Sequence, residues 1–188
     1  DDLFQPSPAN LQIMQDTDPN YRVIDLTTSP FQDAKPSYFH KSLGGYHGAT
    51  LRRYREVVDA QMSKNNMAVY NMLNTRYFIV PAQDGQPTVQ RNPEALGNAW
   101  FVKEVKQVNN ADEELKALDS FNPRLTAFVD KRFADQLKTV SLQADTSATI
   151  RLTEYKPNHL TYASDSKVAQ VAVLYEIYYR GGIDWKAY

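Results

Sequence analysis

The chain has 188 residues, with 21 Lys and Arg against 22 Asp and Glu, and therefore a formal net charge of −1. This balance argues against a general nucleic-acid binder, which needs an excess of basic residues, and it provides no polybasic membrane anchor. Cysteine is absent, so disulfide scaffolds, thiolate metal sites and thiol nucleophiles are excluded. A chain of this length buries about 70% of its unfolded surface on folding, so it needs no such cross-links.

The beginning of the chain predicts a lead-in followed by a strand. Residues 1–20 are polar and contain three prolines, which predict extended chain with one short helical turn at Ala9–Met14. Residues 21–26 (YRVIDL) alternate in character and predict a strand, with Val23 on one face and Ile24 on the other.

Two helices are predicted next. A helix is expected over residues 50–63, with Thr50 as its N-cap. Four apolar residues recur at the spacing of one helical face: Leu51, Tyr54, Val58 and Met62. Residues 67–74 predict a second, shorter helix, in which Tyr70 and Leu73 are expected to contact the core.

The middle of the chain predicts strands separated by one helix. Residues 77–80 (YFIV) form an apolar run that predicts a buried strand, and Asp84-Gly85 predicts a turn. Residues 99–108 alternate well enough for a single strand. Residues 111–120 predict a short helix with its leucines inside, and residues 125–129 predict another strand.

The last part of the chain predicts β structure only. Residues 148–155 and 159–163 flank the turn signal Lys-Pro-Asn and predict a β-hairpin. Residues 168–179 are the longest strand candidate, and Gly181-Gly182 is expected to turn the chain towards Trp185.

These elements predict an α+β fold, because the periodicity changes from 3.6 residues to two residues along the chain. We expect a small mixed sheet with a few helices in the first two-thirds and antiparallel, β-sandwich-like strands at the C-terminal end. The predicted organisation is a lead-in at 1–20, a mixed α/β subdomain at 21–138, and a β-rich, truncated subdomain at 139–188.

Residues 38–54 (YFHKSLGGYHGATLRRY) contain two of the three histidines and three of the seven glycines. Glycines allow close backbone approach, and aromatic faces beside Arg and His suit a sugar, a phosphate or a protein edge. This segment is therefore the predicted ligand-binding site, with the candidates Tyr38, His40, Tyr46, His47, Arg52 and Arg53. A competing interpretation is that the glycines serve a tight turn and the tyrosines fill the core.

Several candidate sites have simpler alternatives. His40 and His47 could converge on a metal with Asp33, but a spacing of seven is not diagnostic of metal ligands, and surface or hydrogen-bonding histidines are the favoured interpretation. The arginines of the helix start can hold a phosphate or carboxylate, or form a solvated face in which Arg55 pairs with Asp59.

No catalytic residue and no cofactor are predicted. The chain lacks the phosphate-binding loop, the dinucleotide fingerprint, the zinc-protease motif and the nucleophile elbow, and no pair of carboxylates stands out as an acid and base. Trp100 and Trp185 are candidate sugar-stacking platforms, with core positions as the alternative. His159, beside the hairpin turn, is expected to be a polar cross-strand residue.

A resemblance to a known family covers the chain from about Tyr21 to Tyr188. It is carried by YRVIDLTTSPF, SYFHKSLGGYHGATLRRY, NMLNTRYFIVP and RNPEALGNAWFV, together with the β-rich end. With these segments the chain resembles the large extracytoplasmic region of the YfhO-type bacterial membrane proteins, in the version found in Bacteroidetes-type bacteria. These polytopic proteins are similar to membrane-embedded glycosyltransferases that use lipid-phosphate-linked sugars.

The resemblance implies a periplasmic location as part of an integral membrane protein, with the catalytic acid in a membrane-proximal loop outside this chain. It also implies that the family pattern continues past this chain into more strands and a membrane helix. Gly44-Gly45-Tyr46 and Arg52-Arg53-Tyr54 resemble the segment that returns towards the membrane face. The expected partners are the transmembrane part of the parent chain and a glycan or lipid-linked sugar, with no nucleic acid.

Two functions are consistent with this sequence. The first is an accessory domain that binds a glycan or acceptor without being catalytic itself, within a parent that transfers a sugar. The second is a purely structural or protein-interaction domain of a cell-envelope protein. An independent hydrolase is not favoured, because no nucleophile, acid and base set is visible.

Overall fold

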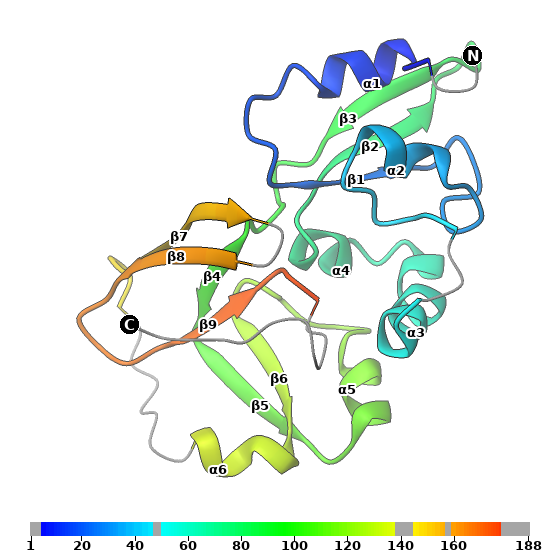
Figure 1. Ribbon diagram of the computed structural model, residues 1–188. Helices are drawn as coiled ribbons and strands as arrows, with labels where there is room; N and C mark the ends of the chain where they lie inside the picture. Colours follow the sequence, from blue (N-terminus) through cyan, green and yellow to red (C-terminus); the bar gives the residue numbers. More distant parts are fainter. Residues whose placement is uncertain (1–4, 47–49, 138–144, 157–158, 178–188) are drawn as a thin grey trace.

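The computed structural model describes residues 5–46, 50–137, 145–156 and 159–177, and these form the predicted α+β fold (Figure 1). The helices are α1 (Pro8–Ile13), α2 (Lys35–Phe39), α3 (Arg52–Ala60), α4 (Met67–Met72), α5 (Ala111–Ala117) and α6 (Ala134–Leu137), with 3-10 turns at Met62–Lys64 and Lys131–Phe133. The strands are β1 (Arg22–Asp25), β2 (Thr75–Pro81), β3 (Pro87–Arg91), β4 (Ala99–Val102), β5 (Glu104–Val108), β6 (Thr126–Asp130), β7 (Thr149–Lys156), β8 (His159–Asp165) and β9 (Val171–Leu174).

The first sheet is small and mixed, as predicted. Its order is β1-β2-β3, with β1 parallel and β3 antiparallel to the central strand β2. β2 contains the predicted apolar run, and the turn to β3 contains Gly85 with a φ of 79°. A left-handed φ of this kind favours glycine, which explains the turn signal read from the sequence.

The two faces of this sheet pack against different groups of helices (Figure 1). Val23 and Ile79 lie in one apolar cluster with residues of α1, whereas Ile24 and Phe78 lie in another with residues of α3 and α4. Neighbouring residues of a strand point to opposite faces, so this division follows from the alternation of the strand. The predicted placement of Val23 and Ile24 on opposite faces is confirmed.

Helix α3 has the predicted buried face but begins later than expected. Val58 of α3 and Met62 of the following 3-10 turn are buried in the cluster below the sheet, as their spacing predicted, but the α-helix itself ends at Ala60 rather than at residue 63. The prediction of Thr50 as N-cap is wrong, because the helix begins at Arg52 and Leu51 occupies the cap position without a side-chain cap.

Helix α4 follows after a sharp break. Asn65 has a φ of 56°, and the side chain of Asn66 accepts a hydrogen bond from the backbone N–H of Ala68 at 3.1 Å. Asparagine suits both positions, since it tolerates left-handed backbone and caps helix N-termini well. Tyr70 and Leu73 are buried as predicted.

The predicted single strand at 99–108 is wrong, because the structure has two strands there. β4 ends at Val102 and pairs antiparallel with β9, whereas β5 begins at Glu104 and pairs parallel with β6. The backbone N–H groups of Lys103 and Glu104 both donate to the carbonyl of Leu125, at 2.9 and 3.0 Å. The chain therefore changes partner at Lys103, which sequence alternation does not reveal.

The prediction of residues 168–179 as the longest strand is also wrong. β9 has four residues, 171–174, whereas β7 has eight. β9 is short because its partner β4 has only four residues. After Lys103 the chain continues as β5, which pairs with β6 instead. Gly181-Gly182 and Trp185 lie outside the described residues. The pairing of β4 with β9 joins segments on either side of the predicted boundary at residue 138.

The remaining predicted elements are present. β7 and β8 form the predicted antiparallel hairpin, and β6 is the strand expected near 125–129. Helix α5 connects β5 to β6 in a strand–helix–strand unit and is capped by Asn110, which accepts from the N–H of Glu113 at 2.9 Å. Leu115 and Leu118, which were predicted to lie inside the core, are only half-buried.

A charged cluster joins the loop after α1 to the central strand. Arg76 contacts Asp16 at 3.0 Å and Asp18 at 2.6 Å, and the Tyr77 hydroxyl donates to Asp16 at 2.8 Å. Burial raises the pKa of Asp16, but hydrogen bonds from Tyr77, the Asp18 N–H and Arg76 lower it more, so the net shift is downward.

This lowered pKa predicts a contribution of Asp16 to acid stability. The folded state binds the proton less readily than the unfolded state, so the stabilisation is present above the ordinary pKa of 3.8 and is lost as the pH falls through the lower folded value. We expect Asp16→Asn to flatten the dependence of the unfolding free energy on pH below about 4. Urea titrations across this range measure it, with Asp165→Asn, an exposed carboxylate elsewhere, as the control.

Candidate functional site

The predicted binding segment forms one wall of a cavity of about 220 Å³. The loop contributes Gly44 and Gly45, and the helix start contributes Leu51 and Tyr54. The strand β1, helix α3 and the end of the described chain complete it with Arg22, Arg55 and Ile177.

The loop is fixed to the edge of the first sheet by backbone hydrogen bonds. The N–H of Val23 donates to the carbonyl of Lys41 at 3.1 Å, and the N–H of Leu43 donates to the carbonyl of Val23 at 2.9 Å. Ser42 thereby forms a parallel bridge with Val23, and Leu43 is buried in the core cluster. The cavity wall is consequently part of the scaffold.

The two glycines allow the loop to approach the Pro30 turn closely. A Cβ on Gly44 would lie 1.9 Å from the Pro30 carbonyl oxygen, which no side chain tolerates. The N–H of Gly45 donates to the same oxygen at 2.8 Å, and Gly45 has a φ of 129°. These positions therefore require glycine for packing and backbone conformation, which is the tight-turn interpretation.

Tyr54 ties helix α3 to this loop. Its hydroxyl donates to the carbonyl of Leu43 at 2.5 Å. Burial raises the pKa of Tyr54 to about 12, so the hydroxyl keeps its proton and remains a donor at neutral pH. Tyr54 therefore forms part of the cavity wall and also provides a hydrogen-bond donor for the Leu43 carbonyl.

Arg22 is the unusual residue of this cavity. Its side chain is only 16% exposed, and its Nε has no hydrogen-bond partner among the residues that the structure describes. The nearest carboxylate oxygen belongs to Glu176 at 3.7 Å, and the guanidinium lies 5.2 Å from the centre of the Tyr175 ring. A buried donor without a partner is destabilising. The Nε of Arg22 is thus a buried donor that an added acceptor would satisfy, beside a Glu176 carboxylate whose Oε1 is also unpaired in the described part of the chain.

The second guanidinium of the cavity is partly exposed. Arg55 contacts Asp59 at 3.5 Å, which confirms the predicted pair one helical turn apart. An exposed pair at this distance is weak and exchanges readily with a ligand. Arg55 is therefore available to a negatively charged group in a way that a buried pair is not.

The other predicted site residues are dispersed. Tyr38 on α2 and Tyr46 in the loop are 65% and 73% exposed, and neither lines the cavity. Arg52 pairs with Glu56 at 2.8 Å on the outer face of α3. Arg53 pairs with Glu114 of α5 at 2.9 Å and lines a different cavity. His47 lies outside the described residues.

His40 is used in packing. Its Nε2 shares a hydrogen bond of 2.8 Å with Asn10 Oδ1, and burial lowers its pKa, which favours the neutral ring at pH 7. Asp33 accepts from the N–H of Lys35 at 2.9 Å at the start of α2. Among the residues that the structure describes, no group of three acidic, histidine or cysteine side chains is placed to hold a metal ion.

Sequence reasoning missed Arg22 and Ile177. Arg22 carried a signal, because the alternation of the strand places it on the same face as Ile24, which is buried. A charged residue on a buried face needs a partner or a ligand. Ile177 has no such signal in the sequence, because only the tertiary fold brings this residue to the loop cavity.

Two further candidates from the sequence lie away from the loop cavity. Trp100 is half-buried, its indole N–H donates to the Pro123 carbonyl at 2.8 Å, and its ring lines the same cavity as Arg53, so neither the sugar-stacking nor the core interpretation is decided for it. His159 is an exposed polar residue that contacts Thr161 of its own strand at 3.1 Å and lies 3.8 Å from Glu154 across the hairpin, as predicted.

Within the described part of the chain, no helix combines the length and the apolar composition that crossing a membrane requires. Comparisons of the chain with protein-family models, with curated proteins and with solved structures found no match.

Proposed function

We propose that this chain is an accessory binding domain, not itself catalytic, whose loop cavity takes a polar group that is anionic or glycosidic. The observation that carries this proposal is Arg22, a largely buried guanidinium that lines the cavity with an unpaired Nε. A phosphate, carboxylate or sugar oxygen supplies the missing acceptor.

The size of the cavity supports a small group. Its volume of about 220 Å³ is below the usual range for drug-sized ligands, roughly 300–1,000 Å³. One sugar ring or one phosphate group fits this volume, and an extended oligosaccharide would continue outside it. Arg55 lies at the cavity with an exposed side chain and can contact the part of the ligand that remains in solvent.

We further propose that the domain lies on the extracytoplasmic, periplasmic face of a bacterial membrane, attached to the transmembrane part of its own parent chain. The support is the resemblance to the YfhO-type proteins. Two of the segments that carry it, residues 21–31 and 37–54, provide most of the residues around the cavity. The ligand is then a glycan or lipid-linked sugar handled by a glycosyltransferase-like parent.

Arg55→Gln and Arg52→Gln test the binding proposal as a matched pair. Both arginines lie on α3 and pair with a carboxylate four residues later, but only Arg55 lines the cavity. The probes are inorganic phosphate, glucose 1-phosphate and a panel of bacterial glycans, followed by backbone amide NMR shifts of Gly45 and Arg22. We expect Arg55→Gln to weaken binding by roughly tenfold, about 1.4 kcal/mol, and Arg52→Gln to leave it unchanged.

If no probe shifts these amides, the binding proposal fails. The structural or protein-interaction role then becomes the better explanation. Equal weakening by both variants would likewise show that only the general charge of α3 matters.

A further inference from the structure

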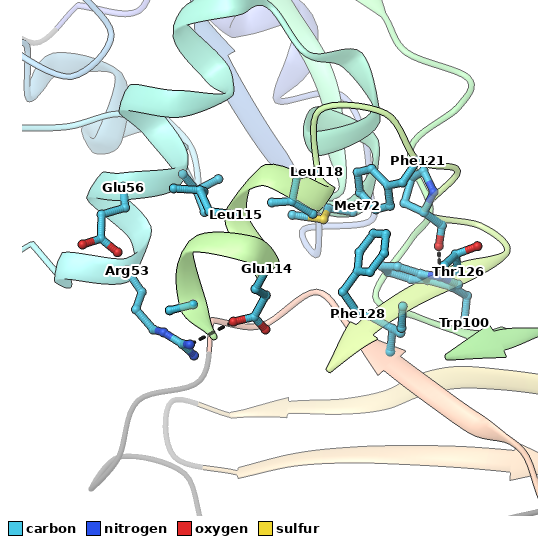
Figure 2. Close-up of a pocket in the computed structure, with 15 residues that line it drawn as sticks. Arg53, Glu56, Met72, Trp100, Glu114, Leu115, Leu118, Phe121, Thr126 and Phe128 are labelled. Atoms are coloured by element: carbon cyan, nitrogen blue, oxygen red, sulfur yellow. Dashed lines mark hydrogen bonds and ion pairs between the residues drawn. The ribbon is translucent and has the colours of Figure 1, made fainter. Parts of the chain in front are cut away.

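A second cavity of about 290 Å³ lies between α3, α5 and the strands β4, β6 and β9, separate from the loop cavity. Figure 2 shows its labelled side chains converging on a common space from several elements. The walls are formed mainly by Val57, Met72, Trp100, Leu115, Leu118 and Phe128.

The interior of this cavity is almost entirely apolar. The one polar atom of Trp100 is already bonded to Pro123, so the ring presents only its hydrocarbon surface. Phe121 and Phe128 lie with their ring centres 5.8 Å apart in a tilted arrangement. Such a lining attracts an apolar group and gives no partner to a polar one.

The apolar lining is recessed. Nine large hydrophobic side chains are exposed among the described residues, and none of them lines this cavity: Leu11, Met14, Leu26, Tyr38, Tyr46, Met67, Leu125, Phe133 and Tyr155. A protein partner with a flat surface covers protruding apolar side chains. Here the apolar lining is half-buried in a partly open hollow, which favours a small molecule over a flat protein surface.

The charged residues at the exposed end balance one another. Arg53 pairs with Glu114 at 2.9 Å across the gap between α3 and α5 (Figure 2), and Glu56 pairs with Arg52 at 2.8 Å. Both carboxylates that line the cavity are therefore already neutralised. Once Arg52, which lies outside the cavity, is counted with Arg53, the two arginines and the two carboxylates sum to zero, and this arrangement favours an uncharged occupant.

The volume indicates the size of this occupant. A dry apolar cavity of about 150 Å³ holds benzene, and this cavity is roughly twice as large. We propose that it is a binding site for a small, uncharged, largely hydrocarbon molecule of roughly ten to twelve non-hydrogen atoms. Any polar group of this molecule lies at the exposed end beside Arg53.

The test uses 1-naphthol, an uncharged apolar probe of this size, added to the whole chain. Methyl NMR shifts of Leu115 and Val173 report binding, because these residues lie on different elements, α5 and β9, and both line the cavity. We expect saturable shifts at both methyl groups and nuclear Overhauser contacts between them and the naphthol ring. The exposed Leu11 on α1 is the internal control.

Val57→Trp fills the cavity from α3, and Asp59→Trp places the same side chain on an exposed position of that helix. We expect at least tenfold weaker binding for Val57→Trp and unchanged binding for Asp59→Trp. Equal effects of the two variants, or no saturable shift in the unmodified chain, would overturn the proposal. If Val57→Trp does not fold, the Overhauser contacts in the unmodified chain still decide, and their absence rejects the site.

Discussion

Replacing Gly44 with alanine is expected to destabilise the fold by about 3 kcal/mol or more, with a fall in melting temperature of roughly 6–12 °C. The added methyl group would lie 1.9 Å from the Pro30 carbonyl oxygen and 2.7 Å from its carbon. Both atoms are backbone, so no side-chain rotation relieves the overlap. One of the two loops has to move, and the hydrogen bond from Gly45 to Pro30 is then lost.

Gly85→Ala provides the comparison for this prediction. Nothing lies within 4 Å of a Cβ on Gly85, but its φ of 79° is unfavourable for alanine. We therefore expect a cost of about 1 kcal/mol from backbone conformation alone. Thermal unfolding of both variants measures the difference. A Gly44→Ala variant no less stable than Gly85→Ala would show that the Pro30 turn is free to move, and the loop would not be a rigid wall.

Replacing Gln61 with alanine is the second large effect, with an expected loss of about 3 kcal/mol. Gln61 is 1% exposed, and its amide donates to the carbonyl of Leu115 at 3.0 Å and to Asp119 at 2.9 Å. Its oxygen accepts from Asn66 at 2.8 Å. Alanine leaves the Leu115 carbonyl without this donor and also creates a void between α3 and α5.

Two measurements test the Gln61 prediction. Urea denaturation gives the stability loss, with Gln12→Ala on the exposed face of α1 as a control that should change little. NMR titration of Asp119 gives a second readout: the hydrogen bond from Gln61 is the largest cause of its lowered pKa, so the variant should raise this pKa. An unchanged Asp119 titration would mean that the amide contact contributes nothing in solution.

Much of the fold could be predicted because local patterns and tertiary packing agree. The alternation of Val23 and Ile24 and the helical spacing of Val58 and Met62 each reflect a buried face that the structure contains. The errors occur where the end of a strand depends on pairing with a residue that is distant in the sequence. In the sequence Lys103 looks like the middle of one strand. In the structure its backbone N–H donates to the carbonyl of Leu125, a residue distant in sequence, and the strand ends there.

The candidate site was predictable in part. The glycines of the loop marked a close backbone approach, and this approach is present at Pro30. The sequence could not say that Arg53 faces α5 while Arg55 faces the loop cavity, because this depends on how the helix is rotated against both neighbours. Arg22 became a site residue only when Glu176 and Ile177 were placed beside it.

The pairing of β4 with β9 has a consequence for the order of folding. Val102 pairs with Val171, whereas Val108 pairs with Asp130, so the first pairing closes a loop roughly three times as long. Loop-closure entropy makes the longer closure costlier by about 1 kcal/mol, and pairings with high contact order form slowly. Glu176 and Ile177 follow β9 directly, so the loop cavity receives its last wall only when this slow closure is complete.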